Sequence, residues 1–246
     1  MTALAPISTA TAVAAAALTR TYGAGDSAVH ALRGVSLEVP AGQFTAVMGP
    51  SGSGKSTLMH LLAGLDAPDA GSVHIAGRDI TRMSDRELTK LRRTHIGFVF
   101  QSFNLLPTLT AEENVALPLS IAGRKPDRAA LDALLERMGL AERRGHKPAQ
   151  LSSGQQQRVA VARALIAQPT VLFADEPTGN LDSTAGDGVL RLLRDAVDLG
   201  GQTTVMVTHD ARAAASADRV LFLADGRIVA DLDQPTEAQI LAALKP

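Results

Sequence analysis

The sequence predicts an α/β protein with a mostly parallel core sheet, and three observations support this prediction. Short apolar runs near residues 44–48, 96–100, 170–174, 203–208 and 219–223 are typical of buried strands. Segments with helical spacing of apolar residues alternate with these runs, an order typical of parallel sheets. Hydrophobic residues make up 46% of the 246 residues, which is enough for a substantial core in one large domain or two smaller lobes.

The N-terminal part predicts strands outside this alternation. The apolar run at residues 11–18 has no Lys or Arg before it, so it is not typical of a signal peptide, and we expect a loose tail that leads into a first strand. Residues 12–42 predict short strands, because apolar and polar residues alternate over 35–39. Residues 72–80 predict a hairpin that bends at Gly77.

The segment from Gly49 to Ser56 matches the pattern G-x-x-x-x-G-K-[ST], which binds phosphate groups. Its glycines let successive backbone N–H groups converge on phosphate oxygens, and the helix predicted after it adds its positive end. Lys55 is expected to reach the β- and γ-phosphates, and the Ser56 hydroxyl to bind Mg²⁺. A flexible Gly/Ser turn is the alternative, and the flanking strand and helix argue against it. The residues expected to bind nucleotide here are Gly49, Ser51, Gly52, Ser53, Gly54, Lys55, Ser56 and Thr57.

Helices are predicted after the hairpin and through the middle of the chain. Residues 81–93 contain a capping box formed by Ser84 and Glu87, which predicts a helix. Residues 102–160 are predicted to be mainly helical. Four apolar residues share one face there: Leu131, Leu134, Leu135 and Met138.

Two carboxylates follow the apolar run at residues 170–174. Asp175 is placed to hold Mg²⁺, directly or through water. Glu176 is the expected general base or water-orienting group, because a hydrolysing site needs an acceptor beside the γ-phosphate. A solvated turn is the more common explanation of such an acidic pair alone, and the phosphate-binding loop reverses that preference.

The stretch LSSGQQQRVAVARAL, residues 151–165, predicts an amphipathic helix capped at its start, and helix starts of this kind also bind anions. Here the sequence resembles the ATP-binding subunits of ABC transporters, from about residue 12 to 230. In that family the LSGGQ signature of one subunit closes over the γ-phosphate bound by the other. Ser152, Gly154 and Gln155 match the signature. Ser153 replaces its second glycine, which would cost about 1 kcal/mol if the position requires a positive φ.

The resemblance assigns roles to residues that carry little information alone. Gln101 resembles the glutamine that senses Mg²⁺ and the attacking water. The alternative for a lone glutamine is an ordinary surface residue. Asp182 resembles the aspartate that reaches across the dimer, with a helix N-cap as the alternative. His209 resembles the histidine that bonds the γ-phosphate. Tyr22 lies where the family stacks an aromatic ring on adenine, with a plain core or surface tyrosine as the alternative. The expected catalytic set is Glu176, His209, Gln101 and Lys55, and the expected Mg²⁺ ligands are Ser56, Gln101 and Asp175.

The family also implies an architecture. We expect a P-loop NTPase core of the RecA-like type with a mostly parallel sheet, an antiparallel β subdomain, and an α-helical subdomain at about 102–160. The expected boundaries are a flexible tail over 1–11, the ATPase domain over 12–230, and a helical C-terminal tail over 231–246.

The implied function is ATP hydrolysis, of the translocase class, at a head-to-tail dimer interface. It would drive an integral-membrane subunit that docks near residues 102–119, with the chain peripheral on the cytoplasmic face of the inner membrane. The segments FNLLPTLTAEENV and DEPTGNLD most resemble the branch for lipoprotein release and macrolide export. The sequence leaves open the transported substrate, the membrane subunit, export against mechanotransmission, and a homodimer against a heterodimer.

Two alternatives remain within the family: a soluble ATPase that acts on DNA or ribosomes, and a regulatory cassette without turnover. A near balance of 24 Lys and Arg against 25 Asp and Glu gives no basic excess, so nucleic acid is not an expected partner. The absence of cysteine excludes disulfides and thiolate metal sites. No run approaches the roughly 20 apolar residues that span a bilayer, so we expect a soluble chain.

Overall fold

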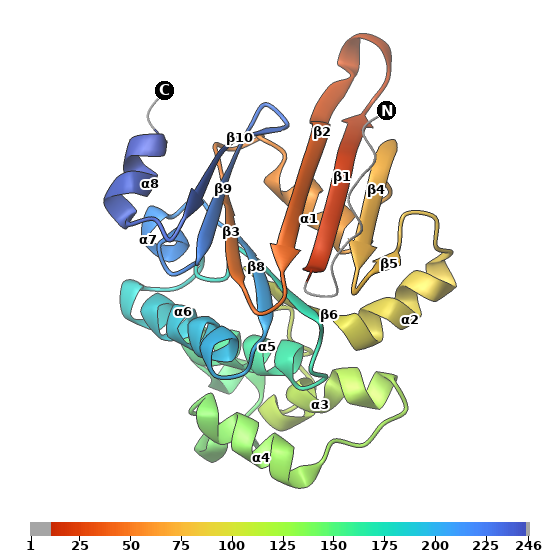
Figure 1. Cartoon of the computed structure of the whole chain (residues 1–246). Coiled ribbons are helices and arrows are strands. Elements are labelled where there is room, and N and C mark those ends of the chain that lie inside the picture. The colour runs from red at the N-terminus through yellow and green to blue at the C-terminus, as the bar shows by residue number, and fades with distance from the viewer. Residues whose placement is uncertain (1–10, 245–246) are drawn as a thin grey trace.

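The computed structural model describes residues 11–244, and these form two sheets with helices around them (Figure 1). One sheet is antiparallel with the strand order β2-β1-β4-β5, and the other has the order β10-β9-β3-β8-β7-β6. The strands are β1 Thr11–Tyr22, β2 Val29–Pro40, β3 Phe44–Met48, β4 Ala70–Ile75, β5 Arg78–Asp79, β6 Ile96–Phe100, β7 Val171–Asp175, β8 Thr203–Val207, β9 Arg219–Ala224 and β10 Arg227–Asp233. The helices are α1 Lys55–Leu62, α2 Asp85–His95, α3 Ala111–Ile121, α4 Arg128–Arg137, α5 Ser153–Leu165, α6 Ser183–Asp198, α7 Ala211–Ala214 and α8 Glu237–Ala243, with short 3₁₀ turns at Gly25–Ser27, Ala141–Arg143 and Pro148–Gln150.

The larger sheet confirms the predicted parallel core. Its neighbours from β9 to β6 are parallel, and only β10 runs antiparallel, beside β9. Alternate side chains of each strand enter different cores, since successive residues of a strand face opposite sides of the sheet. Met206 and Leu172 pack with α5 and α6, whereas Val205 and Phe173 pack with α1 and the antiparallel sheet. Burial on both faces explains why these strands are almost continuously apolar.

The antiparallel sheet confirms the β subdomain but corrects its start. Residues 11–18 belong to β1 instead of a loose tail, and β1 and β2 are 12 residues each instead of several short strands. The alanine-rich run is weak as a strand signal, and pairing on both sides overrides it: Val13 lies opposite Val39 of β2 and Ile75 of β4. The predicted hairpin is present as β4 and β5. Residues 1–10 of the predicted tail lie outside the described residues.

The helices agree with the predictions except at the start of α2 and at the start of the C-terminal tail. The capping box of Ser84 and Glu87 is present, but α2 begins at Asp85, because the N-cap residue itself is not helical. The four apolar residues predicted to share a face in the middle of the chain are all buried. The C-terminal tail is helical only in α8, because residues 231–233 complete β10 in pairing with β9. Within residues 11–244, none of the helices is both long and apolar enough to cross a bilayer.

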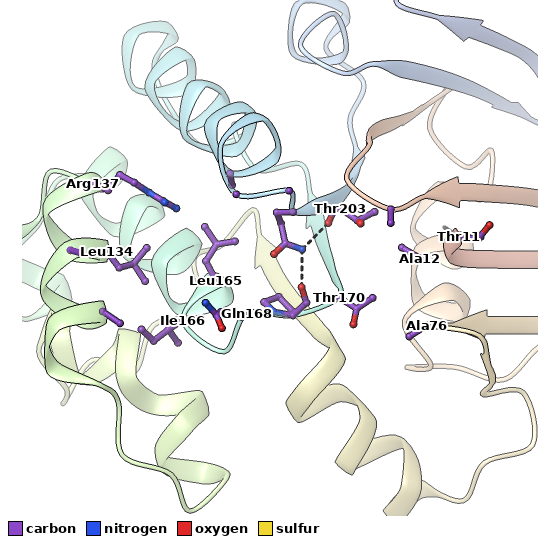
Figure 2. A pocket seen from close by; sticks show the side chains of 18 of the residues that line it. Thr11, Ala12, Ala76, Leu134, Arg137, Leu165, Ile166, Gln168, Thr170 and Thr203 are labelled. Carbon is purple, nitrogen blue, oxygen red and sulfur yellow. Dashed lines mark hydrogen bonds between the residues drawn. The ribbon is translucent and has the colours of Figure 1, made fainter. Parts of the chain in front are cut away.

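A cavity of about 730 Å³ opens at the amino ends of the parallel strands (Figure 2). Its lining includes Thr170, which directly precedes β7, and Thr203, which begins β8. Leu134 of α4 also lines it. Small side chains dominate the rest of the lining, and Arg137 is its charged residue. We refer to it below as the amino-end cavity.

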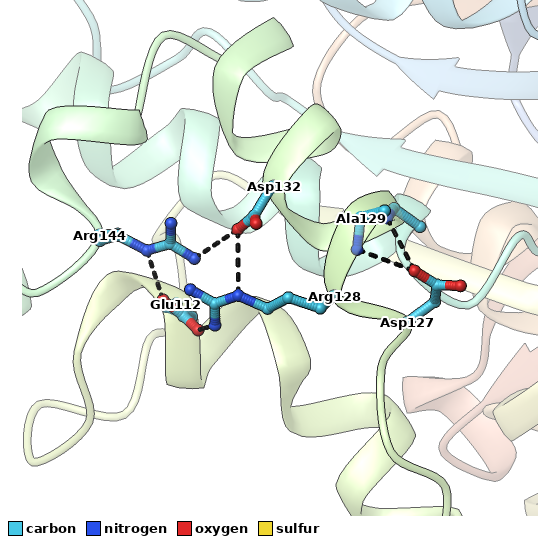
Figure 3. A network of polar contacts seen from close by, with 7 residues as sticks. Glu112, Asp127, Arg128, Ala129, Asp132 and Arg144 are labelled. Atoms are coloured by element: carbon cyan, nitrogen blue, oxygen red, sulfur yellow. Dashed lines mark hydrogen bonds and ion pairs between the residues drawn. The ribbon is translucent and has the colours of Figure 1, made fainter.

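An ion-pair network holds the helical part of the chain together (Figure 3). Arg144 donates from Nε to Glu112 at 2.6 Å and from Nη2 to Asp132 at 2.7 Å, and Arg128 contacts the same two carboxylates. Bonding to Arg144 lowers the pKa of both carboxyl groups, and the pair of acids raises the pKa of Arg144. The network joins α3, α4 and the segment that leads to the signature at 151–155. It thereby fixes the start of α3 beside that segment.

Candidate nucleotide site

Four groups of predicted site residues lie where the parallel strands end. β3, β6, β7 and β8 are followed directly by the phosphate-binding loop, Gln101, Glu176 and the Thr208–His209 pair. Backbone bonds link these ends: the amide of Glu176 donates to Val207 O at 2.9 Å, and that of Thr208 donates to Val47 O at 3.2 Å. Open α/β sheets bind ligands in the crevice outside the carboxyl ends of their strands, which is where these residues lie.

Two glycines of the loop are required by their surroundings. At Gly49, with φ +151°, a Cβ atom would lie 2.0 Å from Leu223 O. At Gly54, the N-cap of α1 with φ +104°, a Cβ atom would lie 2.4 Å from Ala31 O. No side chain larger than hydrogen fits at either position, so the loop folds tightly over the β3 end and delivers α1 to the site.

Lys55 begins α1 and folds back over the loop. Its Nζ donates to Gly49 O at 2.9 Å and to Pro50 O at 2.8 Å. Burial lowers the pKa of Lys55, and the charges of Glu176 and Asp175 oppose that shift. The ammonium group is thus held at the centre of the loop, facing the acidic end of β7.

A pocket of about 470 Å³ lies over this loop, and we call it the carboxyl-end pocket. It brings together predicted residues from four separate segments of the chain. Its lining is Tyr22, Val29, Ala31, Ser51, Gly52, Gly54, Lys55, Ser56, Thr57, Glu176, Val207 and His209. The Tyr22 ring is 40% exposed, its hydroxyl donates to Asp66 at 2.9 Å, and the Arg20 guanidinium lies 4.9 Å from its centre. The ring is therefore fixed at the rim of the pocket, with the Arg20 guanidinium over one of its faces.

Glu176 and His209 form a pair at the inner end of the pocket. Nδ1 of His209 lies 2.8 Å from Oε1 of Glu176, and the hydroxyl of Thr208 donates to Oε2 at 3.3 Å. The Glu176 side chain is 18% exposed, whereas that of His209 is 74% exposed. Glu176 also has φ +46°, a left-handed conformation that costs a non-glycine residue about 1 kcal/mol or more. Its surroundings therefore hold this carboxylate in a strained, defined position.

The hydroxyl and carboxylate oxygens near the loop fit a small hard cation. Burial raises the pKa of Asp175 and the neighbouring Glu176 raises it further, while the positive charges of His60 and Lys55 oppose the shift. Among residues 11–244, no three His, Asp or Glu side chains cluster as a complete ligand set. Mg²⁺ beside a nucleotide needs only one or two protein oxygens besides phosphate, and Ser56 and Asp175 carry oxygens of that kind, although Asp175 itself does not line the carboxyl-end pocket.

Gln101 is placed away from the carboxyl-end pocket. Its Nε2 donates to Oδ1 of Asn180 at 3.2 Å, and Nδ2 of Asn180 donates to Gln101 O at 3.1 Å. Gly179 makes room for this pair, because a Cβ atom there would lie 2.7 Å from Nε2 of Gln101. The sequence analysis missed Asn180 as a partner, and nothing local in the sequence signals a contact 79 residues apart.

The signature residues form a second surface, and none of them lines the carboxyl-end pocket. Ser152 caps α5 in a capping box with Gln155, and Asp182 caps α6 by accepting from the amide of Ala185. Gly154 lets the two helix starts approach, because its Cβ would lie 2.9 Å from Cβ of Ala185. Ser153 lies in the first turn of α5 with an ordinary backbone conformation, so the expected strain does not arise.

The chain is a P-loop nucleotide-binding protein, because it combines a phosphate-binding loop with an acidic strand end and a parallel sheet. A model of the ABC transporter family matches residues 32–179. The Macrolide export ATP-binding/permease protein MacB of Marinobacter nauticus is 50% identical over 216 residues, which cover 87% of this chain and 33% of that protein. MacB of Rhodopseudomonas palustris strain BisB18 is 49% identical over 228 residues, covering 92% and 35%.

The comparison with solved structures indicates the same family. The cassette MJ0796, in a dimeric post-hydrolysis state bound to ADP and Pi, is 42% identical with a TM-score of 0.82, over 91% of this chain and 99% of that one. The chain belongs to the ABC transporter family, as an ATP-binding cassette. The predicted family and its likeness to the macrolide-export branch are confirmed, and the alternative role on DNA or ribosomes is not favoured. The chain spans about a third of the length of the curated relatives it matches.

Proposed function

We propose that two copies of this chain bind ATP between them, hydrolyse it and so drive a membrane subunit. The observation that carries the proposal is the separation of two surfaces. The carboxyl-end pocket holds the phosphate loop, while Ser152 and Asp182 lie outside it at the starts of α5 and α6. A nucleotide touched by both surfaces therefore needs a second copy, and MJ0796 is dimeric.

Binding is the task of the loop and the rim of the pocket. Residues 51, 52 and 54–57, which include the start of α1, line the pocket, and backbone amides at a helix start suit the phosphates of a nucleotide. Lys55 would exchange its two carbonyl acceptors for phosphate oxygens. Tyr22 would stack on the adenine. Ser56 and Asp175 would hold Mg²⁺, which neutralises charge on the phosphates.

Hydrolysis needs a proton acceptor beside the attacking water, and Glu176 has that role. Its carboxylate is held by Thr208 and His209 and is nearly enclosed. His209 is largely exposed toward the surface, where it can donate to the γ-phosphate once a nucleotide and a second copy are present. Gln101 would join the metal after leaving Asn180.

A cysteine cross-link tests the head-to-tail dimer, since the chain has no cysteine of its own. Ser53 is only 4% exposed, so the exposed Ser51 is the better reporter on the loop side. We expect Ser51→Cys protein mixed with Ser153→Cys protein to form a disulfide-linked dimer on gels with Mg-ATP, and little without nucleotide. Leu199→Cys, at a position 79% exposed near the far end of α6, is the control partner and should not cross-link to Ser51→Cys. Equal linkage of both pairs would contradict the proposed arrangement.

We propose that the loop at residues 102–110 docks the membrane subunit. Asn114, fully buried, accepts from the amide of Leu106 at 2.8 Å and donates to the carbonyls of Leu106 and Leu109. Arg163 of α5 donates to the carbonyls of Phe103 and Asn104. These bonds fix the loop so that Leu106 stays 45% exposed, an apolar side chain on a rigid support. Its docking site would lie on the cytoplasmic face of the inner membrane.

Leu106→Glu is expected to abolish co-purification with an integral-membrane subunit from detergent-solubilised membranes, because a carboxylate would be desolvated in the contact. Nucleotide binding, measured by fluorescent ATP titration, should stay within about twofold, since Leu106 is outside the carboxyl-end pocket. Leu65→Glu is the matched control, because Leu65 is also 45% exposed and lines a separate pocket that contains no residue of the loop. Unchanged co-purification of the Leu106→Glu protein would refute the docking surface.

A further inference from the structure

Gln157 lies in α5 with no exposed surface, and its side chain joins two strand ends. Its Nε2 donates to Phe100 O at 3.2 Å and to Pro177 O at 2.6 Å. Phe100 directly precedes Gln101, and Pro177 directly follows Glu176. One amide group from the signature helix thus holds the backbone next to both of these site residues.

Gln157 is an unfavourable residue for filling this buried space, because one of its polar atoms has no partner. Its Oε1 is buried and has no hydrogen-bond partner among the described residues, which is unfavourable because a buried acceptor has lost its bonds to water. A methionine has similar length, adapts its shape and has no strong polar group to satisfy. Packing alone therefore does not explain why residue 157 is a glutamine. The positions of its two acceptors, Phe100 O and Pro177 O, do explain it.

Both acceptors lie where the backbone leaves the sheet. Phe100 and Asp175 are paired at the ends of the neighbouring parallel strands β6 and β7. Beyond that pair the segments that follow β6 and β7 are no longer paired with each other. Glu176, the first residue after β7, takes a left-handed conformation. The ladder of sheet hydrogen bonds no longer fixes the distance between the strands there, so the Gln157 amide is placed to fix it.

We propose that Gln157 is a positioning residue of the ATPase site, which sets the separation between the Gln101 and Glu176 backbones. The inference rests on the proposed function of those two residues. Ser152 and Gln155 lie at the start of the same helix, on the surface that would meet a second copy. A displacement of α5 on dimer formation would move Phe100 O and Pro177 O together, through a single side chain.

Gln157→Met tests this inference in the full chain. We expect kcat to fall by about 10- to 100-fold, the range for a small displacement of reacting groups. The KM for ATP and the binding of a fluorescent ATP analogue should stay within about twofold, because Gln157 does not line the carboxyl-end pocket. The unfolding temperature should be unchanged or higher, since a buried unpaired oxygen is removed. Hydrogen exchange should become faster at the amides of residues 101–104, 176 and 178–180, as a readout independent of activity.

Gln202→Met is the matched control. Gln202 also bridges two backbone segments, with Nε2 donating to Pro169 O and Thr203 O at 3.0 Å each. It lines the amino-end cavity, at the opposite ends of the parallel strands from the carboxyl-end pocket. Loss of this bridge should leave kcat and exchange at the site unchanged.

Two results would overturn the inference. A Gln157→Met protein with wild-type kcat would show that the bridge does not position the site. A parallel loss of kcat, nucleotide affinity and unfolding temperature would show that Gln157 serves only the fold. Normal turnover after Glu176→Gln would instead overturn the proposed function, so the two failures are distinguishable.

Discussion

Glu176→Gln is expected to lower ATP turnover by about 100- to 10,000-fold, the range for loss of a general base. The amide is nearly isosteric with the carboxylate but cannot take up a proton from water. The amide oxygen can accept from the Thr208 hydroxyl, and the amide NH₂ can donate to Nδ1 of His209 in its other tautomer, so the fold should persist. ATP should then remain bound between two copies, because the γ-phosphate that joins the two surfaces is not removed.

Phosphate release and light scattering measure the two halves of this result. The variant should release little phosphate and form a stable dimer with ATP, whereas ADP should leave it monomeric. Glu136→Gln is the matched control, since Glu136 is exposed on α4 and away from the pocket. Normal phosphate release from Glu176→Gln would require another proton acceptor and would contradict the assignment.

Lys55→Ala is expected to weaken ATP binding by about 10- to 100-fold. The reason is the loss of a charge-assisted contact to phosphate, worth about 1.5–3 kcal/mol. The same substitution leaves Gly49 O and Pro50 O without their Nζ donor, so the loop should loosen as well. Both effects act in the same direction on nucleotide affinity.

Titration with fluorescent ATP measures this affinity, and thermal unfolding shows whether the fold persists. Lys90→Ala provides a control, because Lys90 is exposed in α2 and does not line the pocket. ATP binding that is unchanged in Lys55→Ala would mean that the loop amides alone hold the phosphates, against the role proposed for Lys55.

The parts predictable from sequence are those specified by neighbours in the chain. The strands of the parallel sheet have continuous apolar runs because both of their faces are covered, and the loop from Gly49 to Ser56 combines local turn chemistry with a helix start. Ser84 and Ser152 were predictable as caps for the same reason. The family pattern then assigned roles to single residues such as His209.

The parts not predictable depend on contacts between distant residues. The alanines of β1 become a strand only because β2 and β4 pair with them on both sides. The partner of Gln101 is 79 residues away, and the acceptors of Gln157 are 57 and 20 residues away. Composition and periodicity do not encode such pairs, since they describe only one segment at a time.

In the proposed dimer, the bond between Gln101 and Asn180 would connect the site to the second copy. Asn180 lies two residues before Asp182, the aspartate that faces the second copy in that proposal. A single hydrogen bond contributes only about 0.5–1.5 kcal/mol, so contact with a second copy at Asp182 would need to supply little free energy to release the Gln101 side chain.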